Sequence, residues 1–350
     1  MALEVSIKKE FGEFCLDVSF ENHGNCMGIL GASGCGKSMT LKCIAGIETP
    51  DQGRIVLNGR VLFDSKKINI APQKRNVGYM FQNYALFPTM TIEENIGVGI
   101  KENKVGRRAI IHNQIEKFQL KGLEKRYPRQ LSGGEQQRVA LARILAYNPE
   151  IIMLDEPFSA LDAYLKDTLQ QELFDTLRHY SGDIIMVSHN RDEIFKFCDT
   201  LSVIDQGRVV AGGNTREIFT RPLNVISARL TGCKNISKIQ KINDYELQAI
   251  DWGIRLKTAE VIRDEIEYVG IRAHRLRPDN NPKADNSMKI ELVRFTEAPF
   301  EVAYLVKNAL ETDILNIWWL SSKKEFDCVV MEEIPEYLVF PPEELMLLQS

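Results

Sequence analysis

Short, largely apolar runs alternate with longer helical segments through the first two thirds of the chain. These runs suit buried strands, and they occupy 26–30, 77–80, 151–154, 184–187 and 201–204. The residues between and after them predict helices at 37–45, 107–120, 139–146, 162–179 and 190–197, with one more opening at 214–217. Strands that alternate with helices predict an α/β domain, in which helices pack on a largely parallel sheet.

The first 65 residues carry a second pattern, in which apolar and polar positions alternate. Residues 3–7 and 14–20 show this alternation, which is typical of half-buried strands. Segments 54–57 and 60–63 flank Asn58-Gly59, a dipeptide that favours a tight hairpin turn. We therefore expect four short strands here in addition to the buried runs.

The pattern changes again after about residue 230. Long amphipathic helices give way to strand-like segments separated by turns, at 245–250, 254–257, 267–273, 289–295, 302–306 and 328–332. This predicts a small all-β domain, an OB-like Greek-key barrel. We expect two domains, an α/β domain over residues 1–230 and the β domain over residues 231–350.

Composition narrows the class of protein. The 350 residues are 44% hydrophobic and 26% charged, with a formal net charge of −4, so nothing in the overall charge favours nucleic acid as a partner. No apolar run approaches the roughly 18 residues of a membrane span, and the first residues lack a secretory signal. The seven cysteines form no C-x-x-C pair, which favours reduced thiols in the cytosol.

Residues 31–38, Gly-Ala-Ser-Gly-Cys-Gly-Lys-Ser, have the spacing of a phosphate-binding loop. An apolar strand precedes them and a helix follows, which is the context that this motif needs. The glycines let successive backbone N–H groups point at an anion, and the helix N-terminus adds its partial positive charge. Lys37 is expected to reach the β- and γ-phosphates, and the Ser38 hydroxyl to bind Mg²⁺.

A phosphate loop needs a carboxylate at the end of a neighbouring strand to hold the metal. The apolar run 151–154 is followed directly by Asp155 and Glu156. Asp155 emerges at the carboxyl end of that strand, where α/β sheets bind their ligands. Glu156 is a candidate general base that accepts a proton from an attacking water.

Residues 131–135, Leu-Ser-Gly-Gly-Glu, are the most specific motif in the chain. Ser132 and Glu135 have the spacing of a capping box, and the paired glycines leave backbone N–H groups uncovered at a helix N-terminus. This is a second candidate anion site about one hundred residues from the first. A two-fold homodimer would let each phosphate loop face the glycine turn of the partner across one ATP.

With these motifs in order, the chain resembles the nucleotide-binding subunits of ATP-binding cassette (ABC) transporters over roughly residues 1–225. The resemblance rests on the loop 31–38, Gln82, the motif 131–135, the carboxylates 155–156, Ser159-Ala-Leu-Asp162 and His189. It implies a P-loop NTPase cassette with a mainly parallel sheet and a helical subdomain, and ATP and Mg²⁺ as cofactors. One departure is Asn190, where members of the family usually have Asp after the histidine.

The resemblance also implies a role for each matching residue. Glu156 would be the general base, His189 the switch that contacts the γ-phosphate, and Gln82 a sensor of metal and water. Asp155 would join Ser38 and Gln82 at the metal. The implied nucleotide contacts are Phe11, Gly31, Ala32, Ser33, Gly34, Cys35, Gly36, Lys37, Ser38 and Met39. The implied contacts to the partner subunit's nucleotide are Leu131, Ser132, Gly133, Gly134, Glu135 and Asp162.

The partners and cargo follow from the same resemblance. A single cassette without a membrane span implies two separate permease subunits, a homodimer of cassettes at the cytoplasmic face of the membrane, and an extracytoplasmic substrate-binding protein. Residues 86–91 and 155–162 resemble importer subunits, and the C-terminal part resembles a TOBE-type regulatory domain. Segments 231–236 and 270–275 resemble molybdate and sulfate importers more than sugar importers.

Other interpretations stay open at this point. The cargo of an importer with this motor could be a sugar, a polyamine or ferric iron. The chain could also be a soluble ABC ATPase of translation or DNA repair, although it has neither a second cassette nor a long coiled-coil insertion. A catalytically silent regulatory module is disfavoured because Glu156 and His189 are both present. Phe14 is an alternative to Phe11 as the aromatic that stacks on adenine.

Overall fold

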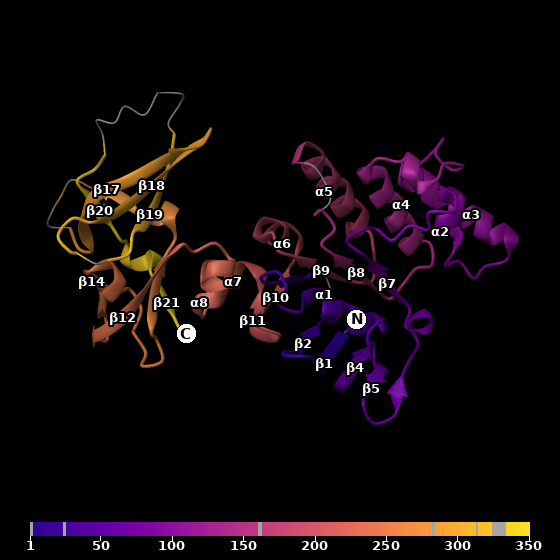
Figure 1. The fold of residues 1–350 in the computed structure, drawn as a ribbon, viewed down its shortest axis with the longest axis horizontal. Coiled ribbons are helices and arrows are strands. Elements are labelled where there is room, and N and C mark those ends of the chain that lie inside the picture. The colour runs from indigo at the N-terminus through magenta and orange to yellow at the C-terminus, as the bar shows by residue number, and fades with distance from the viewer. Residues whose placement is uncertain are drawn as a thin grey trace. The chain divides into compact units, whose positions relative to one another are not determined.

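A computed structural model describes residues 3–23, 26–159, 163–279, 281, 284–312, 314–323 and 334–350. The chain divides into two compact units, Met1–Arg216 and Glu217–Ser350. The two units differ in class: the first is an α/β unit and the second consists mainly of strands (Figure 1).

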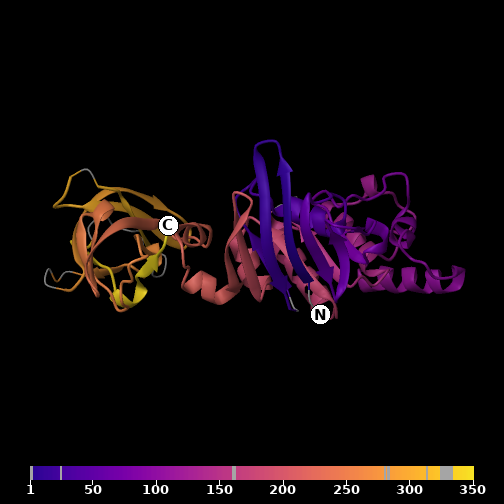
Figure 2. The same cartoon turned by 90° about the horizontal axis from the view of Figure 1, so that it is seen from below.

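The first unit is built on one mixed sheet of eleven strands, in the order β6-β5-β4-β1-β2-β11-β10-β3-β9-β8-β7. Strands β10, β3, β9, β8 and β7 run parallel to one another, whereas β1, β2, β4, β5 and β6 pair antiparallel. The bounds are β1 (Leu3–Phe11), β2 (Phe14–Asn22), β3 (Cys26–Leu30), β4 (Gln52–Leu57), β5 (Arg60–Asp64), β6 (Ile68–Asn69), β7 (Val77–Met80), β8 (Ile151–Asp155), β9 (Asp183–Ser188), β10 (Thr200–Asp205) and β11 (Arg208–Asn214). Figure 2 shows the long β1–β2 hairpin beside the rest of this sheet.

Helices connect these strands and pack on the sheet. The bounds are α1 (Lys37–Ala45), α2 (Ile92–Gly97), α3 (Lys104–Lys117), α4 (Gly133–Leu145), α5 (Ala163–Arg178) and α6 (Arg191–Phe197). Helices α2, α3 and α4 lie side by side as a group between β7 and β8 in the chain (Figure 1). The first unit therefore has the parallel sheet and the helical subdomain that the sequence predicts.

Local sequence signals mark where several of these helices begin. The side chain of Thr91 and that of Glu94 form a capping box at the start of α2, and Asn103 caps α3. Ser132 and Glu135 form the same kind of box at the start of α4. Helix α1 ends at Gly46, whose left-handed backbone (φ 77°) returns its N–H to the last turn.

The core of the first unit lies between the sheet and its helices. All five residues of β8 and all six of β9 are buried, as expected for central parallel strands covered on both faces. Apolar side chains from β1, β2, α1 and β4 join them in one cluster. This core holds the carboxyl ends of the central strands in a fixed arrangement.

The second unit contains two five-stranded sheets whose strands pair antiparallel. The first has the order β14-β13-β12-β15-β21, and the second has the order β16-β20-β17-β18-β19. The bounds are β12 (Asn235–Asn243), β13 (Glu246–Ala249), β14 (Ile254–Lys257), β15 (Tyr268–Ile271), β16 (Arg277–Asp279), β17 (Ser287–Glu297), β18 (Glu301–Asn308), β19 (Ile317–Ser322), β20 (Tyr337–Val339) and β21 (Met346–Leu348), with α7 (Thr215–Thr220) and α8 (Val225–Leu230) ahead of them. Residues of both sheets share one apolar core that contains Trp252 and Phe340.

Most of the predicted elements are confirmed, with shifted ends. The helix expected at 139–146 begins at Gly133, and the one expected at 107–120 spans Lys104–Lys117. The sequence did not predict helices α2 and α8 or strands β6, β11, β12, β16, β19, β20 and β21. The capping box Thr91-Ile-Glu-Glu94 nevertheless marks α2 in the sequence. The strand expected at 328–332 lies outside the described residues.

Candidate functional site

The loop 31–38 joins β3 to α1, as the sequence predicts. Lys37 is the first residue of α1 and is only 5% exposed. Its Nζ atom donates hydrogen bonds to the carbonyl oxygens of Gly31 (2.9 Å) and Ala32 (2.8 Å), so the ammonium group is held inside the curl of the loop. A cation at this position faces whatever anion the loop amides bind.

Two glycines allow this curl. Gly36 caps α1 with φ 108°, in the left-handed region that residues with side chains rarely adopt. A Cβ atom on Gly31 would lie 2.3 Å from the carbonyl oxygen of Ile204 and 2.5 Å from Sγ of Cys35. Burial raises the pKa of the Cys35 thiol, so this residue stays protonated at neutral pH and serves to pack the loop.

Ser38 and Asp155 meet at the start of α1. The Ser38 hydroxyl donates to Oδ1 of Asp155 at 2.8 Å, and the Tyr79 hydroxyl donates to Oδ2 at 2.8 Å. Burial, followed by the negative charge of Asp155, raises the pKa of Tyr79, so this hydroxyl keeps its proton. Asp155 is itself only 6% exposed. The two hydroxyl donors fix the orientation of its carboxylate.

The parallel register brings four predicted motifs to one edge of the sheet. Leu30, which ends β3 before the phosphate loop, pairs with Ser188, which precedes His189. On the other side of β9, Val187 pairs with Asp155 of β8. On the far side of β8, Leu154 pairs with Met80 of β7. The loops that follow β3, β9, β8 and β7 therefore leave the sheet side by side.

Glu156 and His189 are in direct contact at this edge. Oε2 of Glu156 lies 3.1 Å from Nδ1 of His189. Glu156 has a left-handed backbone with φ 48°, which is uncommon for a residue with a long side chain and is often found at functional sites. Its N–H donates to the carbonyl of Val187 at 3.0 Å, which holds the turn against β9.

Gln82 follows β7 by two residues and is exposed. Gln82 and Glu156 each follow by two positions the last residues that β7 and β8 pair, Met80 and Leu154. After Gln82 the chain makes a turn in which Tyr84 (φ 60°) and Ala85 (φ 43°) both have left-handed backbones. Two such residues in succession are strained, and their conformation must be supported by the surroundings.

Two polar side chains that sequence reasoning missed supply this support. Arg143 of α4 donates to the carbonyl oxygens of Ala85 (2.8 Å) and Tyr84 (3.0 Å), and its guanidinium lies over the ring of Phe87. Asn95 of α2 is fully buried and accepts from the N–H of Phe87 while it donates to three carbonyls of residues 87–91. No local pattern marks Arg143, because it acts on a loop 58 positions away in the chain. Asn95 lies only four to eight positions from its partners and directly follows the capping box of Thr91 and Glu94.

The motif 131–135 forms the N-terminus of α4. The backbone N–H of Ser132 donates to Oε2 of Glu135 at 2.7 Å, and the N–H of Glu135 donates to Oγ of Ser132 at 3.4 Å. The bond from the Ser132 N–H, together with a second one that the Ser132 hydroxyl donates to the same Oε2 at 2.9 Å, lowers the pKa of Glu135. α4 therefore has the predicted glycine turn at its start and the Arg143 contact near its end.

The aromatic residues near the phosphate loop differ in their surroundings. Phe14, at the start of β2, lines a recess of about 860 Å³ together with residues 32–35 and Asp205. Phe11, at the end of β1, is exposed and lies under Nζ of Lys9 at 4.6 Å. Both remain candidates for contact with a nucleobase. Asp162, the remaining predicted contact residue, lies outside the described residues.

The donor set fits Mg²⁺ better than a metal that proteins hold by themselves. The described residues contain no group of three or more His, Cys, Asp or Glu side chains that could hold a metal ion. Mg²⁺ is typically bound through one or two protein oxygens together with substrate phosphates and water. Oγ of Ser38 and Oδ1 of Asp155, which are 2.8 Å apart beside the loop, supply such oxygens.

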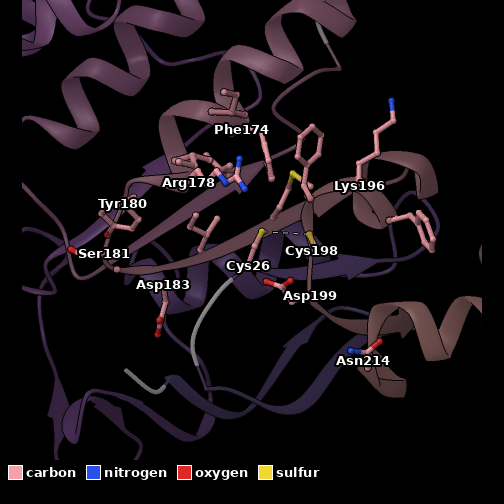
Figure 3. A pocket seen from close by; sticks show the side chains of 18 of the residues that line it. Cys26, Phe174, Arg178, Tyr180, Ser181, Asp183, Lys196, Cys198, Asp199 and Asn214 are labelled. Atoms are coloured by element: carbon pink, nitrogen blue, oxygen red, sulfur yellow. Dashed lines mark hydrogen bonds between the residues drawn. The ribbon is translucent and has the colours of Figure 1, made fainter.

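A second cavity, of about 640 Å³, lies among α5, β9 and α6 and is lined by none of the predicted site residues (Figure 3). The sulfur atoms of Cys26 and Cys198 face each other there at 3.5 Å. Burial, and then the contact with Cys26, raises the pKa of the Cys198 thiol. The reactive thiolate is therefore disfavoured, and the pair serves as packing.

Two arginines of the segment 270–275 are already engaged. Arg272 donates to the carbonyl of Thr231 at 2.8 Å and also to the carbonyl of Phe219. Arg275 forms an ion pair with Glu344 at 3.0 Å. The segments that resemble oxyanion importers, 231–236 and 270–275, thus use Arg272 to hold the start of the second unit together.

The sequence of this chain is similar to those of known proteins. Residues 16–159 match the family model of the ABC transporter. The chain is 42% identical over 318 residues to an Fe(3+) ions import ATP-binding protein of Haemophilus influenzae (strain 86-028NP), a match that covers 85% of this chain and 88% of the relative. It is 39% identical over 261 residues to a molybdate/tungstate import ATP-binding protein of Pyrococcus horikoshii, covering 71% and 74% of the two chains.

A solved structure is also similar to this chain. It is the dimeric, post-hydrolysis state of the ATP-binding cassette MJ0796 bound to ADP and phosphate, with a TM-score of 0.53 and 27% identity. The match covers 62% of this chain and 99% of that one. None of the described helices of the present chain is long and apolar enough to cross a membrane.

Proposed function

This chain belongs to the ABC transporter family, as an ATP-binding protein of import type, and we propose that it drives the uptake of an inorganic oxyanion such as molybdate or sulfate. It is an ATP hydrolase of the ABC type. The observation that supports the motor is the arrangement of the strand ends, because β3, β9, β8 and β7 bring the phosphate loop, His189, Glu156 and Gln82 to one edge.

Each residue at this edge has a task in hydrolysis. Lys37 and the amides of the loop neutralise the charge of the β- and γ-phosphates, and Phe11 or Phe14 stacks on the adenine. Glu156 accepts a proton from the attacking water, and His189, in contact with Glu156, reaches the γ-phosphate. Ser38, Asp155 and Gln82 would hold Mg²⁺, which when bound offsets the negative charge of the phosphates.

Two copies of the chain would be needed for a complete site. The glycine turn at the start of α4 and the phosphate loop are separate anion sites, so each ATP is bound between the loop of one copy and residues 131–135 of its partner. Asp162 would couple the two sites. Closure of this dimer on ATP and its release after hydrolysis would supply the movement that drives transport.

The partners follow from the same arrangement. We expect two membrane-spanning permease subunits, with the motor bound peripherally at the cytoplasmic face and a substrate-binding protein on the other side. Residues 83–91 would receive the permease, since their strained turn is held rigidly by Arg143 and Asn95. In that position α4 would connect the docked permease to the ATP of the partner copy.

Two cargoes have specific support. An oxyanion is favoured by the molybdate/tungstate relative and by the resemblance of segments 231–236 and 270–275. Ferric iron is the second candidate, because the iron-import relative is 42% identical and its match extends over 85% of this chain. The second unit would act as a regulatory domain of the TOBE type in either case.

The motor is tested by the release of phosphate from ATP by the purified chain. We expect hydrolysis that requires Mg²⁺, stops when EDTA is added and returns when Mg²⁺ is restored. Failure of the purified, folded chain to bind ATP in calorimetry would overturn the assignment of the phosphate loop.

The cargo is tested in cells that lack this protein. Loss of molybdenum content or of radiolabelled sulfate uptake, with iron uptake retained, is the expected result. Loss of iron uptake with unchanged oxyanion uptake would replace the oxyanion with ferric iron. If no uptake changes and the chain fails to co-purify with membrane proteins, a soluble ABC ATPase is the better description.

A further inference from the structure

We propose that Glu193 is a positioning residue that holds His189 against Glu156 and links it to helix α5. This inference rests on the proposed function, since His189 is assigned there as the group that contacts the γ-phosphate. Glu193 lies on α6, four positions after His189, and its side chain bonds to Ser188, Lys166 and Gln170, none of which is a predicted nucleotide contact. It acts through the backbone on either side of the histidine.

The first part of the link runs from Glu193 to the residues that flank His189. The Ser188 hydroxyl donates to Oε2 of Glu193 at 2.5 Å. The same hydroxyl oxygen accepts the backbone N–H of Asn190 at 2.9 Å. The residue before His189 and the residue after it are therefore tied to one carboxylate, which restricts the direction in which the imidazole points.

The second part runs from Glu193 to α5. Oε1 lies 2.6 Å from Nζ of Lys166 and accepts a hydrogen bond from Nε2 of Gln170 at 3.4 Å. Lys166 follows Asp162, the proposed coupling residue, by four positions. A shift of the first turn of α5 would thus be passed through Glu193 and Ser188 to His189.

Burial explains why this residue is a carboxylate. Glu193 is only 4% exposed, and an ionised carboxylate at such a site is costly unless it is paired and hydrogen-bonded. Ser188, Lys166 and Gln170 all donate, and a carboxylate can accept on both oxygens. An amide cannot satisfy this set, because one end of the amide is itself a donor.

A plain ion pair between α5 and α6 is the structural alternative, and the chain contains one for comparison. Nζ of Lys196 lies 3.9 Å from Oδ1 of Asp167 between the same two helices, but both side chains are largely exposed. That pair has no contact with Ser188. It therefore provides a matched control in which the helices lose an ion pair while the link to His189 is intact.

The experiment compares Glu193→Gln, Ser188→Ala and the control Asp167→Asn in the full-length protein. For the first two variants we expect kcat for ATP hydrolysis to fall about 10-fold to 100-fold with the KM for ATP unchanged, since small errors in the placement of a reacting group cost rates of this order. Asp167→Asn should behave as the wild type. Thermal melting checks that each variant is folded.

The coupling to His189 is measured in two further ways. In a His189→Ala background, single-turnover kinetics should show that Glu193→Gln causes no additional loss. In NMR spectra of protein labelled at its five histidines, the His189 ring signal, identified by its absence in His189→Ala, should move in Glu193→Gln and Ser188→Ala but not in Asp167→Asn.

Two results would overturn the inference. One is an equal loss of kcat from Glu193→Gln with and without His189, and the other is an unmoved His189 signal in the folded variants. The NMR measurement does not depend on activity, so it separates this inference from the proposed function. If the wild-type protein released no phosphate from ATP, the proposed function alone would be overturned.

Discussion

The charged residues at the candidate site of the first unit and those on the strand surfaces of the second unit are held in different ways. In the first unit, Lys37 and Asp155 are nearly inaccessible and are oriented by specific hydrogen bonds at the carboxyl ends of parallel strands. In the second unit, charged side chains such as those of Arg255 and Glu246 form ion pairs at the surface of antiparallel strands. Exposed pairs of this kind contribute little to stability, typically 0–1 kcal/mol.

The difference follows from how the sheets are built. In a parallel sheet every strand ends at the same edge, so segments distant in sequence deliver their loops to one place. In an antiparallel sheet successive ends alternate between two edges, which disperses the loops. The first unit therefore gathers its candidate site residues at one edge of the sheet. A role of the second unit is tested by measuring how its variants change ATP hydrolysis by the first unit.

The largest expected effect is that of Lys37→Ala. Loss of the only loop ammonium near Gly31 and Ala32 should abolish ATP binding measured by calorimetry, because the phosphates lose a buried cation. Lys42→Ala, on the same helix, is the control and should bind ATP normally. If Lys37→Ala bound ATP with wild-type affinity, the buried ammonium would not be part of the nucleotide site, and the contrast between the two units would lose its main support.

Glu156→Gln should leave ATP binding intact but slow hydrolysis. A general base contributes about 10²-fold to 10⁴-fold, so kcat should fall by this factor. Slow turnover should also trap the ATP-bound dimer, which gel filtration with ATP detects. Glu172→Gln, which removes a partly exposed carboxylate that pairs with Arg138, serves as the control. A Glu156→Gln variant that stays monomeric with ATP would argue against the shared site.

Arg143→Ala tests whether the helical group within the first unit supports the loop 83–91. The variant loses two charge-assisted hydrogen bonds, and we expect the free energy of unfolding to fall by about 1.5–3 kcal/mol. Co-purification with the permease should be lost while ATP binding is retained. Arg138→Gln on the same helix is the control, and equal permease binding in both variants would contradict the proposed docking surface.

Arg272→Ala should have the smallest effect on the motor. Removing its hydrogen bonds to the carbonyls of Thr231 and Phe219 should lower the unfolding free energy of the second unit by about 1.5–3 kcal/mol. ATP hydrolysis should be unchanged, and Arg275→Ala, which loses one exposed ion pair, should be nearly neutral in a melting experiment. A loss of hydrolysis in Arg272→Ala would show that the two units are coupled energetically.

Much of the site was predictable because it is local in the sequence. The curl of the loop 31–38 depends on its own glycines, and the start of α4 depends on the capping box of Ser132 and Glu135. The same local logic predicted the buried strands β8 and β9 from their apolar runs. It missed α2, whose six residues are too few to show helical periodicity, although its capping box was visible.

The strand order and the long-range contacts were decided only by the tertiary structure. Ser38 and Asp155 are 117 positions apart, and Arg143 lies 58 positions from Ala85. Nothing in either local segment specifies its partner, since the pairing depends on which strands share hydrogen bonds once the core is buried. Glu193 shows this most clearly, because its sequence neighbours predict only a helix at 190–197, whereas the fold makes it the buried link between α5 and the histidine loop.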